Sequence, residues 1–260
     1  MKKLLLFTVV FMCNASYAQG FENYKSALLV NINSGYELPI RKFMQGMPVD
    51  GHVGYKDNLW SAGIAPYYFI KKRWGVFADF TLYPSSGSKE AEKNADDYVH
   101  DFYAANYFID DYYSFWGSLE SPAAIRFLAG PVYRWENERF LFYAGLGFGV
   151  TNFPTKSYGF KLKQKNSNLN YSVINLNEHS VSPFTIAPTF TAGYKINKRL
   201  SGILNIKAPW FKADFKDELY RFNHYTKQHV TDETFYFKRS SLQLNINAGL
   251  MLVMANKRKL

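Results

Sequence analysis

The chain has 260 residues, of which 47% are hydrophobic, 18% aromatic and 20% charged, with a formal net charge of +10. This composition excludes a disordered chain and collagen-like or linker material, because 20 Tyr and 23 Phe supply far more apolar surface than such chains carry. Beyond residue 20 no apolar run approaches the roughly 18 residues of a spanning helix, so any membrane crossing must be made by strands.

The first 18 residues follow the order of a secretory signal peptide. Lys2 and Lys3 form a basic region, an apolar stretch follows at 4–12, and residues 16–18 are a small-x-small cleavage site. We expect cleavage after Ala18, which makes 1–18 the signal peptide and 19–260 the mature domain. A short N-terminal strand or anchor is the alternative.

The single cysteine, Cys13, lies inside this segment. Lipidation of Cys13 would need small residues at the two preceding positions, where Phe11 and Met12 stand. We therefore expect a mature chain without thiols, which has no cysteine nucleophile, disulfide or cysteine metal ligand.

Eight segments of the mature chain alternate apolar and polar residues with the period of two that is typical of β-strands. They lie at 27–38, 60–70, 74–83, 123–135, 140–151, 184–196, 200–211 and 242–254. The turns near residues 72, 137 and 198 are short, whereas the connections at 39–58, 84–121, 153–182 and 212–236 are long.

An even number of strands, with short turns at one end and long loops at the other, is typical of transmembrane barrels. Closure also satisfies the backbone groups that an open sheet edge would leave unpaired in hydrocarbon. We predict an all-β fold, an eight-stranded antiparallel up-and-down transmembrane β-barrel with short periplasmic turns and long extracellular loops. A soluble periplasmic β-sandwich is the alternative, because its strands alternate in the same way.

The last strand carries a short motif in which Asn247 and Gly249 precede the hydrophobic residues Leu252 and Met254. It matches the signal by which barrel-assembly machinery recognises outer-membrane barrels, although it lacks the terminal aromatic of the proteobacterial form. In this motif and in its strand pattern the chain resembles the small outer-membrane β-barrels common in Bacteroidetes-type bacteria, which are similar to OmpA-type eight-stranded barrels. The resemblance implies the outer membrane of a Gram-negative cell as the location, with outer-membrane lipids and the barrel-assembly machinery as partners.

The lumen of an eight-stranded barrel is filled by side chains, and the phase of the strands places seven polar residues there. They are Glu37, Asp79, Arg126, Arg134, Lys195, Lys207 and Asn245. We expect the charges among them to form a paired network, because a lone buried charge costs several kcal/mol. A gated pore or a catalytic lumen is the alternative. Gly145, Gly147 and Gly149 are expected to make room for the long Arg and Lys side chains.

Aromatic residues near the strand ends predict interfacial girdles. They are Tyr36, Trp60, Tyr67, Trp74, Trp135, Tyr194 and Trp210. Basic residues gather at the predicted periplasmic rim, where they can meet anionic lipid head groups: Lys71, Lys72, Arg73, Lys198, Arg199, Lys257, Arg258 and Lys259. The positive charge therefore suits a membrane, and without a recognised nucleic-acid motif we expect no nucleic acid partner.

The connection at 84–121, here called loop two, interleaves acidic and aromatic residues. Its candidate ligand-binding residues are Tyr98, Phe102, Tyr103, Tyr107, Tyr112, Tyr113 and Trp116. Aromatic side chains supply contact area at low entropic cost, so an extracellular protein or glycan ligand is expected, with packing of the loop over its own barrel as the alternative. Asp96, Asp97, His100 and Asp101 fit no calcium-loop spacing, so we expect no metal and no cofactor, with a divalent cation held by these four residues as the alternative.

Candidate catalytic groups are limited to a few histidines. His179 is followed by Ser180 and Ser182, and His224 and His229 precede Asp232. The first group departs from the His-x-Ser arrangement of barrel lipid A deacylases, and no Asp-x-His pair resembles that of the omptin proteases. We predict no catalytic residues and a non-enzymatic barrel whose loops serve ligand binding, adhesion or surface protection. The alternatives are an accessory barrel of a secretion or assembly machine and a lipid A-modifying enzyme.

Overall fold

The structure, a computed structural model, describes residues 24–41, 59–70, 73–84, 97, 100–113, 123–152, 159–167, 170–178, 181–223 and 226–258. The strands are β1 Tyr24–Arg41, β2 Leu59–Phe69, β3 Trp74–Tyr83, β4 Tyr107–Tyr113, β5 Ala124–Glu136, β6 Phe140–Asn152, β7 Gly159–Gln164, β8 Asn170–Glu178, β9 Phe184–Lys195, β10 Leu200–Lys207, β11 Trp210–Asn223 and β12 His229–Arg258. Residues 97 and 100–103 are helical. No helix in the described ranges is long and apolar enough to cross a membrane.

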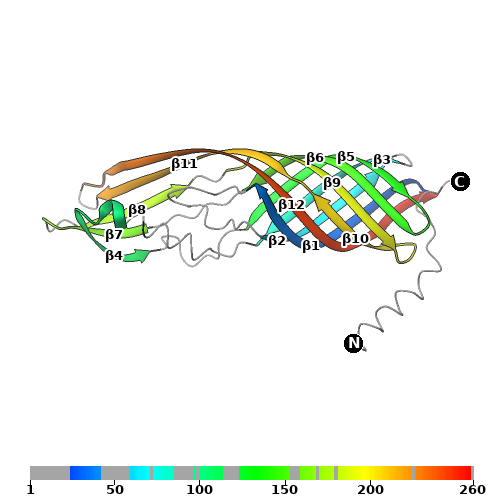
Figure 1. Cartoon of the computed structure of the whole chain (residues 1–260), viewed down its shortest axis with the longest axis horizontal. Helices are drawn as coiled ribbons and strands as arrows, with labels where there is room; N and C mark the ends of the chain where they lie inside the picture. Colours follow the sequence, from blue (N-terminus) through cyan, green and yellow to red (C-terminus); the bar gives the residue numbers. More distant parts are fainter. Residues whose placement is uncertain are drawn as a thin grey trace, which may run out of the picture.

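Eight of the described strands form a closed antiparallel barrel (Figure 1). Their order is β1-β2-β3-β5-β6-β9-β10-β12, and β12 pairs back onto β1 from Tyr24 opposite Arg258 to Arg41 opposite Leu242. Each strand of the barrel wall therefore pairs with the wall strands that precede and follow it in the sequence, which is the up-and-down topology. The predicted barrel is confirmed, and the sandwich alternative is wrong because the sheet closes on itself.

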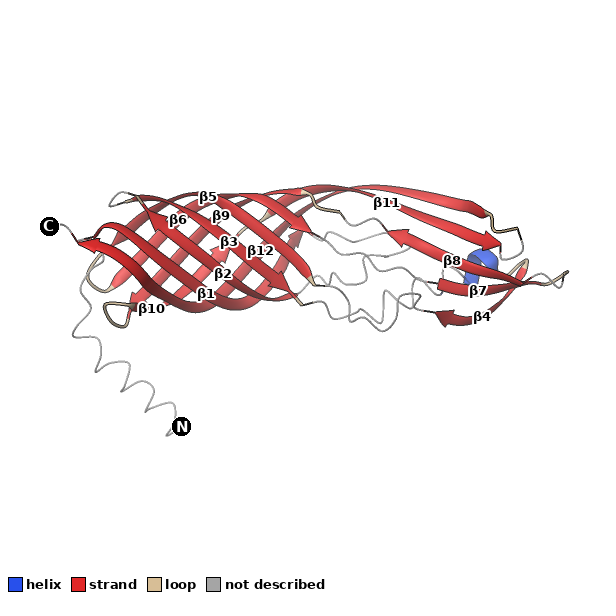
Figure 2. Cartoon of the chain, turned by 180° about the vertical axis from the view of Figure 1, so that it is seen from behind, coloured by secondary structure: helices blue, strands red, loops and turns tan. Residues whose placement is uncertain are grey.

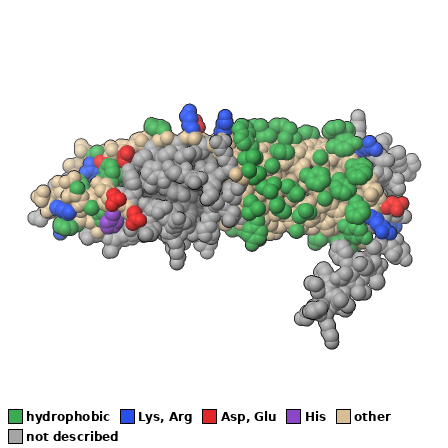
Figure 3. Space-filling model, viewed as in Figure 1, with side chains coloured by type: hydrophobic (Ala, Val, Ile, Leu, Met, Phe, Trp, Pro, Cys, Tyr) green, Lys and Arg blue, Asp and Glu red, His purple; other side chains and the backbone are tan. Residues whose placement is uncertain are grey.

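The two faces of the barrel wall differ sharply in composition. Along β3 the inward side chains are buried, whereas the outward Trp74, Val76 and Phe80 are exposed. Between the two ends of the barrel, the outward positions that the structure describes carry no Asp, Glu, Lys or Arg. Hydrophobic side chains accordingly form a broad band over the barrel in Figure 3, and the charged side chains visible on this face lie beyond its ends. A continuous exposed apolar band of this kind is typical of a wall that faces hydrocarbon.

Aromatic side chains mark both ends of this band. Tyr36, Trp60 and Trp210 are exposed at the end with the long connections, and Trp74 and Trp135 are exposed at the end with the short turns. The predicted girdle position of Tyr67 is wrong, because Tyr67 is only 2% exposed and packs inside the barrel against Phe77 with ring centroids 5.7 Å apart. Tyr67 has the same strand phase as the buried Ala65, so the neighbouring Tyr68 faces outward in its place.

Two of the short turns are built on an asparagine. In the turn between β5 and β6, the side-chain oxygen of Asn137 accepts hydrogen bonds from the backbone N–H groups of Arg139 and Phe140, at 2.9 and 2.7 Å. In the turn between β9 and β10, Asn197 accepts from Arg199 and Leu200 at 2.8 and 2.9 Å. Asparagine side chains stabilise tight turns in this way because they replace a missing backbone acceptor.

Gly130 in β5 allows a close approach of two strands, and its substitution is expected to destabilise the barrel. A Cβ at Gly130 would lie 1.9 Å from the backbone oxygen of Leu146 in β6, whereas a Cβ at the outward Gly202 would meet nothing nearer than 4.0 Å. We expect Gly130→Ala to lower the free energy of unfolding by about 1–3 kcal/mol, as overpacking does, and Gly202→Ala to change it by less than about 0.5 kcal/mol. Urea unfolding in detergent micelles measures both. Equal losses would show that the two strands do not approach closely at Gly130.

Beyond the barrel, β11 and residues 229–241 of β12 form a long two-stranded ribbon, to which β8, β7 and β4 add in that order (Figure 2). These strands are here called the head sheet. The prediction that 153–182 and 212–236 are loops is wrong for the residues that the structure describes, since they contain β7, β8, and parts of β11 and β12. Loop two likewise contains β4, whereas residues 42–58 of the first long connection lie outside the described ranges.

Candidate functional site: the barrel lumen and the head sheet

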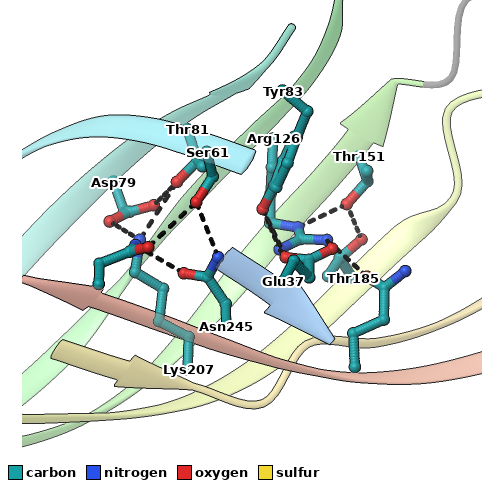
Figure 4. A network of polar contacts seen from close by, with 12 residues as sticks. Glu37, Ser61, Asp79, Thr81, Tyr83, Arg126, Thr151, Thr185, Lys207 and Asn245 are labelled. Atoms are coloured by element: carbon teal, nitrogen blue, oxygen red, sulfur yellow. Dashed lines mark hydrogen bonds and ion pairs between the residues drawn. The ribbon is translucent and has the colours of Figure 1, made fainter. Parts of the chain in front are cut away.

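The first polar cluster of the lumen surrounds Arg126, which is fully buried (Figure 4). Its guanidinium makes a two-pronged contact with Glu37, at 2.6 Å from Nη1 to Oε2 and 3.0 Å from Nη2 to Oε1. Arg126 also donates to Gln243 at 2.9 Å and to Thr151 at 3.0 Å, and the hydroxyl of Tyr83 donates to Glu37 at 2.7 Å. Five different strands of the wall thus contribute to one charge-compensated cluster.

The second cluster surrounds Lys207. Its ammonium group lies 2.5 Å from Oδ2 of Asp79 and donates to Thr81 at 3.1 Å. Beside this pair in Figure 4, Asn245 donates to the hydroxyl of Ser61 at 3.0 Å. Asparagine amides from β1 and β12 extend this layer, with Asn247 donating to Asn33 at 2.9 Å and to Asn245 at 2.7 Å. The layer therefore joins opposite ends of the sequence across the barrel seam.

The third cluster lies toward the short turns and includes a residue that the sequence reasoning missed. Glu136, the last residue of β5, lies 3.0 Å from the ammonium of Lys195 and 3.8 Å from Nε of Arg134, and accepts from the hydroxyl of Tyr143 at 2.7 Å. The guanidinium of Arg134 lies 4.3 Å from the ring centroid of Phe69. Glu136 lies one residue beyond the predicted strand at 123–135, yet its strand phase, shared with Arg134, would have placed it inside.

An apolar layer separates the third cluster from the other two. It contains Leu29, Tyr67, Phe77, Leu141 and Met251, all buried. A Cβ on Gly145 or Gly147 would meet the ring of Phe77 at 3.0 or 3.2 Å. The expectation that these glycines make room for Arg and Lys side chains is therefore wrong, because their neighbour is an aromatic ring of this layer.

All seven predicted lumen residues are buried and distribute among these three clusters. Each of the predicted cations lies beside a carboxylate, either a predicted one or Glu136. Charges in a desolvated interior are tolerated only with such partners. The arrangement holds the barrel wall together from within and leaves the described lumen packed rather than open.

The head sheet has a polar cluster of its own. Oδ2 of Asp232 in β12 accepts hydrogen bonds from the hydroxyl of Tyr103 and, at 2.5 Å, from Nε of Arg221 in β11. Nη1 of Arg221 donates in turn to the hydroxyl of Tyr107 in β4 at 2.6 Å. Tyr103 and Tyr107 come from loop two, and Arg221 and Asp232 come from the two strands of the ribbon. The cluster therefore links loop two, including β4, to the ribbon.

Electrostatics keep Tyr103 and Arg221 in their donor forms. Burial and then the hydrogen bond to Asp232 raise the pKa of Tyr103 well above its usual value, so the phenol stays protonated. The hydrogen bond to Asp232 also raises the pKa of Arg221. The tyrosines of loop two therefore supply polar contacts as well as apolar surface, with Tyr103 donating a hydrogen bond and Tyr107 accepting one.

The predicted ligand-binding residues of loop two have different surroundings. Tyr103 is buried and Tyr107 half-buried in the cluster with Asp232, whereas Phe102 is exposed and contacts Tyr103 edge-on with centroids 4.9 Å apart. Within β4, the backbones of Tyr112 and Tyr113 pair with Phe160 and Gly159 of β7. Tyr98 and Trp116 lie outside the described residues. Among the aromatic residues of loop two whose side chains the structure describes, Phe102 and Phe108 are the exposed ones.

The candidate metal and catalytic groups are only partly described. Among the described residues, no three His, Cys, Asp or Glu side chains lie close enough to hold a metal ion. Asp96, His179, Ser180 and His224 fall outside the described ranges. His229 is exposed with its ring 4.8 Å from that of Phe222, and Asp232 is engaged with Tyr103 and Arg221.

Removing the charge of Asp232 is expected to loosen the head sheet. Asp232→Asn weakens two charge-assisted hydrogen bonds in a half-buried site, which should cost about 1.5–3 kcal/mol of local stability. The matched control is Asp214→Asn, whose ion pair with Lys238 is exposed and should contribute less than about 1 kcal/mol. Limited proteolysis of the folded protein in micelles should cut Asp232→Asn faster in residues 97–113 than the control. Equal rates would mean that the cluster does not hold loop two.

Comparison with known proteins finds distant likenesses among solved structures. No protein-family model matches the sequence, and no curated protein matches it. Among solved structures, the outer membrane protein OprG from Pseudomonas aeruginosa is similar at 14% identity and a TM-score of 0.44, with 89% of this chain and 98% of that chain covered. Ail, the attachment invasion locus protein of Yersinia pestis, is similar at 13% identity and a TM-score of 0.35, with 88% of this chain and 99% of that chain covered. Neisserial surface protein A is similar at 8% identity and a TM-score of 0.36, with 90% of this chain and 97% of that chain covered. These values are too low to transfer a function, ligand or partner to this chain.

Proposed function

We propose that the barrel resides in the outer membrane of a Gram-negative cell and presents the head sheet outside the cell as a non-enzymatic binding surface for an extracellular protein or glycan. Adhesion and surface protection are the two uses such a surface would serve. The observation that carries the proposal is the ribbon of β11 and β12, which continues the barrel wall outward and organises β8, β7 and β4 into one sheet. Binding residues are commonly placed on extensions that a rigid scaffold holds.

The apolar band and the two aromatic ends of the barrel support the membrane location. A soluble protein that exposed this many large side chains in one band would aggregate, whereas in a bilayer the same band is matched by lipid. In bacterial barrels the short turns face the periplasm and the long extensions face outward, which orients the head sheet to the outside. The cleavage after Ala18 that export requires is part of the proposal, and N-terminal sequencing of the membrane protein should begin at Gln19.

The packed lumen argues against a channel as the main function. The three charge-compensated clusters and the apolar layer occupy the described interior, and an eight-stranded barrel has little space beyond its own side chains. The function is therefore assigned to the surface outside the membrane and not to the lumen.

Two measurements test the proposal. Outer-membrane fractions run with and without boiling should show a heat-dependent shift in gel mobility, the behaviour of a closed barrel. Cells that display the chain should then be tested for binding to a glycan array and to immobilised extracellular-matrix proteins. Phe102→Ser with Phe108→Ser should lower binding at least about tenfold, because exposed aromatics dominate such interfaces. Lys198→Ser, on a short turn at the other end, is the control.

Each contrary result has a defined meaning. Absence of both the mobility shift and membrane association would overturn the location. Binding no stronger than that of cells without the protein would overturn the binding role. Retention in a large membrane complex after gentle extraction would favour an accessory barrel of a secretion or assembly machine. A lipid-processing activity that His179→Ala abolishes would favour a lipid A-modifying enzyme.

A further inference from the structure

The outward face of the ribbon changes from apolar to charged within a few residues. At the edge of the apolar band Trp210 pairs with Leu242, and the next outward pair along the ribbon is Lys212 with Ser240. The pair after that is Asp214 with Lys238. Because β11 and β12 continue the outward face of the wall past the band, these are the first charged outward positions that follow it on the ribbon.

The height of these lysines matches the lipid head groups. Two residues of a strand tilted by about 40° rise about 5 Å, which places the start of the Lys212 side chain just above Trp210. The head-group layer on each side of a bilayer is itself about 5–7 Å thick. Lys238 starts one pair further out, and its long flexible stem allows its ammonium group to reach the same layer.

The two ammonium groups are available to an anion. Nζ of Lys212 lies 5.8 Å from the ring centroid of Trp210, so this exposed lysine stays close to the edge of the band. Lys238 is 3.5 Å from Asp214, but the two side chains are 85% and 70% exposed, and such a pair contributes little. With two lysines and one aspartate, this part of the ribbon has an excess of positive charge facing the membrane surface.

We propose that Lys212 and Lys238 bind phosphate groups of a phosphorylated glycolipid in the outer leaflet, with Trp210 at the boundary of its acyl chains. The proposal rests on the membrane location and orientation given under "Proposed function". Basic residues at this height attract anionic head groups, and a tryptophan beside them suits the interface between head groups and hydrocarbon. Binding of this kind would fix the tilt of the ribbon, and with it the head sheet, relative to the membrane surface.

The test uses the full mature chain folded in micelles, with bisphosphorylated lipid A as the probe. Titration followed by native mass spectrometry should show binding about fivefold weaker for Lys212→Gln or Lys238→Gln and about 25-fold weaker for the double variant. Lys163→Gln with Lys227→Gln changes an exposed lysine of β7 and one of the turn between β11 and β12, both away from the band, and should leave binding unchanged. Binding by the unmodified chain should also weaken as salt is raised.

Dephosphorylated lipid A with the same acyl chains is the second probe. The unmodified chain and the double variant should bind it equally, since the removed contacts are to phosphate. Unchanged affinity of the double variant for the bisphosphorylated probe, or an equal loss in the control, would overturn the inference. The heat-dependent mobility shift of each variant distinguishes failure of this inference from failure of the proposed function. If the protein shows the shift but its lipid A binding does not depend on Lys212 and Lys238, only the inference is contradicted. If the unmodified chain shows no shift, the membrane barrel itself is contradicted.

Discussion

Replacing Arg126 with methionine is expected to lower the free energy of unfolding by about 3–5 kcal/mol. The change removes the guanidinium that contacts both carboxylate oxygens of the buried Glu37, to which the hydroxyl of Tyr83 also donates. A desolvated charge without an opposite charge is among the largest single costs that a substitution can produce. Urea unfolding in phospholipid vesicles, followed by tryptophan fluorescence, measures the loss.

The matched control is the double variant Glu37→Met with Arg126→Met. Removing both charges also removes the desolvation cost of each, so the double variant should lose less stability than the two single variants summed. Some cost remains because Gln243 and Thr151 lose a hydrogen-bond donor. Strict additivity of the single variants would show that Glu37 and Arg126 do not interact in the folded protein.

Replacing Leu204 with arginine is expected to cost about 2–4 kcal/mol in a bilayer. Leu204 faces outward from β10, is 45% exposed, and pairs with Ala248 of β12 in the middle of the apolar band. A charge at the middle of hydrocarbon must either be desolvated or pull water and head groups toward it. The loss should appear in folding equilibria measured in phosphatidylcholine vesicles.

Tyr236→Arg is the control for this substitution. Tyr236 also faces outward, but it lies on the head-sheet part of β12 and is 74% exposed. Outside the membrane the same arginine should change stability by less than about 0.5 kcal/mol. If Leu204→Arg were tolerated as well as Tyr236→Arg, the outward face of the barrel would not lie in hydrocarbon.

The sequence predicts which residues face the lumen and which face lipid, because the membrane accepts only an apolar outward face. The outward face of each membrane-spanning strand must be apolar, so the polar residues of the strand must lie on the lumen face. Asp79 and Arg126 were therefore predicted to face inward. The pairing of these residues was not predictable in the same way. Glu37 and Arg126 are 89 residues apart, and their meeting depends on the tilt and stagger of the strands, which the alternation does not contain.

The head sheet was not predicted because the requirement for an apolar outward face applies only to the part of a strand that lies in the membrane. In β11, Lys216, Asp217 and Glu218 follow one another, so the contrast between the two faces is lost there, since both can be polar in water. The remaining signal was the β-propensity of residues 231–237, which include two Thr, two Phe and a Tyr. The contact between Tyr103 and Asp232 spans 129 residues and joins two segments that the sequence analysis had treated as separate loops.

Single-cysteine labelling tests most directly whether the barrel crosses the outer membrane with its head sheet outside the cell. The mature chain is expected to have no cysteine, so Tyr236→Cys on the ribbon and Lys198→Cys on a short turn introduce one thiol each. A maleimide that cannot cross membranes, added to intact cells, should label Tyr236→Cys at once and Lys198→Cys only after the outer membrane is permeabilised, with the unmodified chain as the blank. Labelling of Lys198→Cys in intact cells, or of Tyr236→Cys only after permeabilisation, would contradict the account.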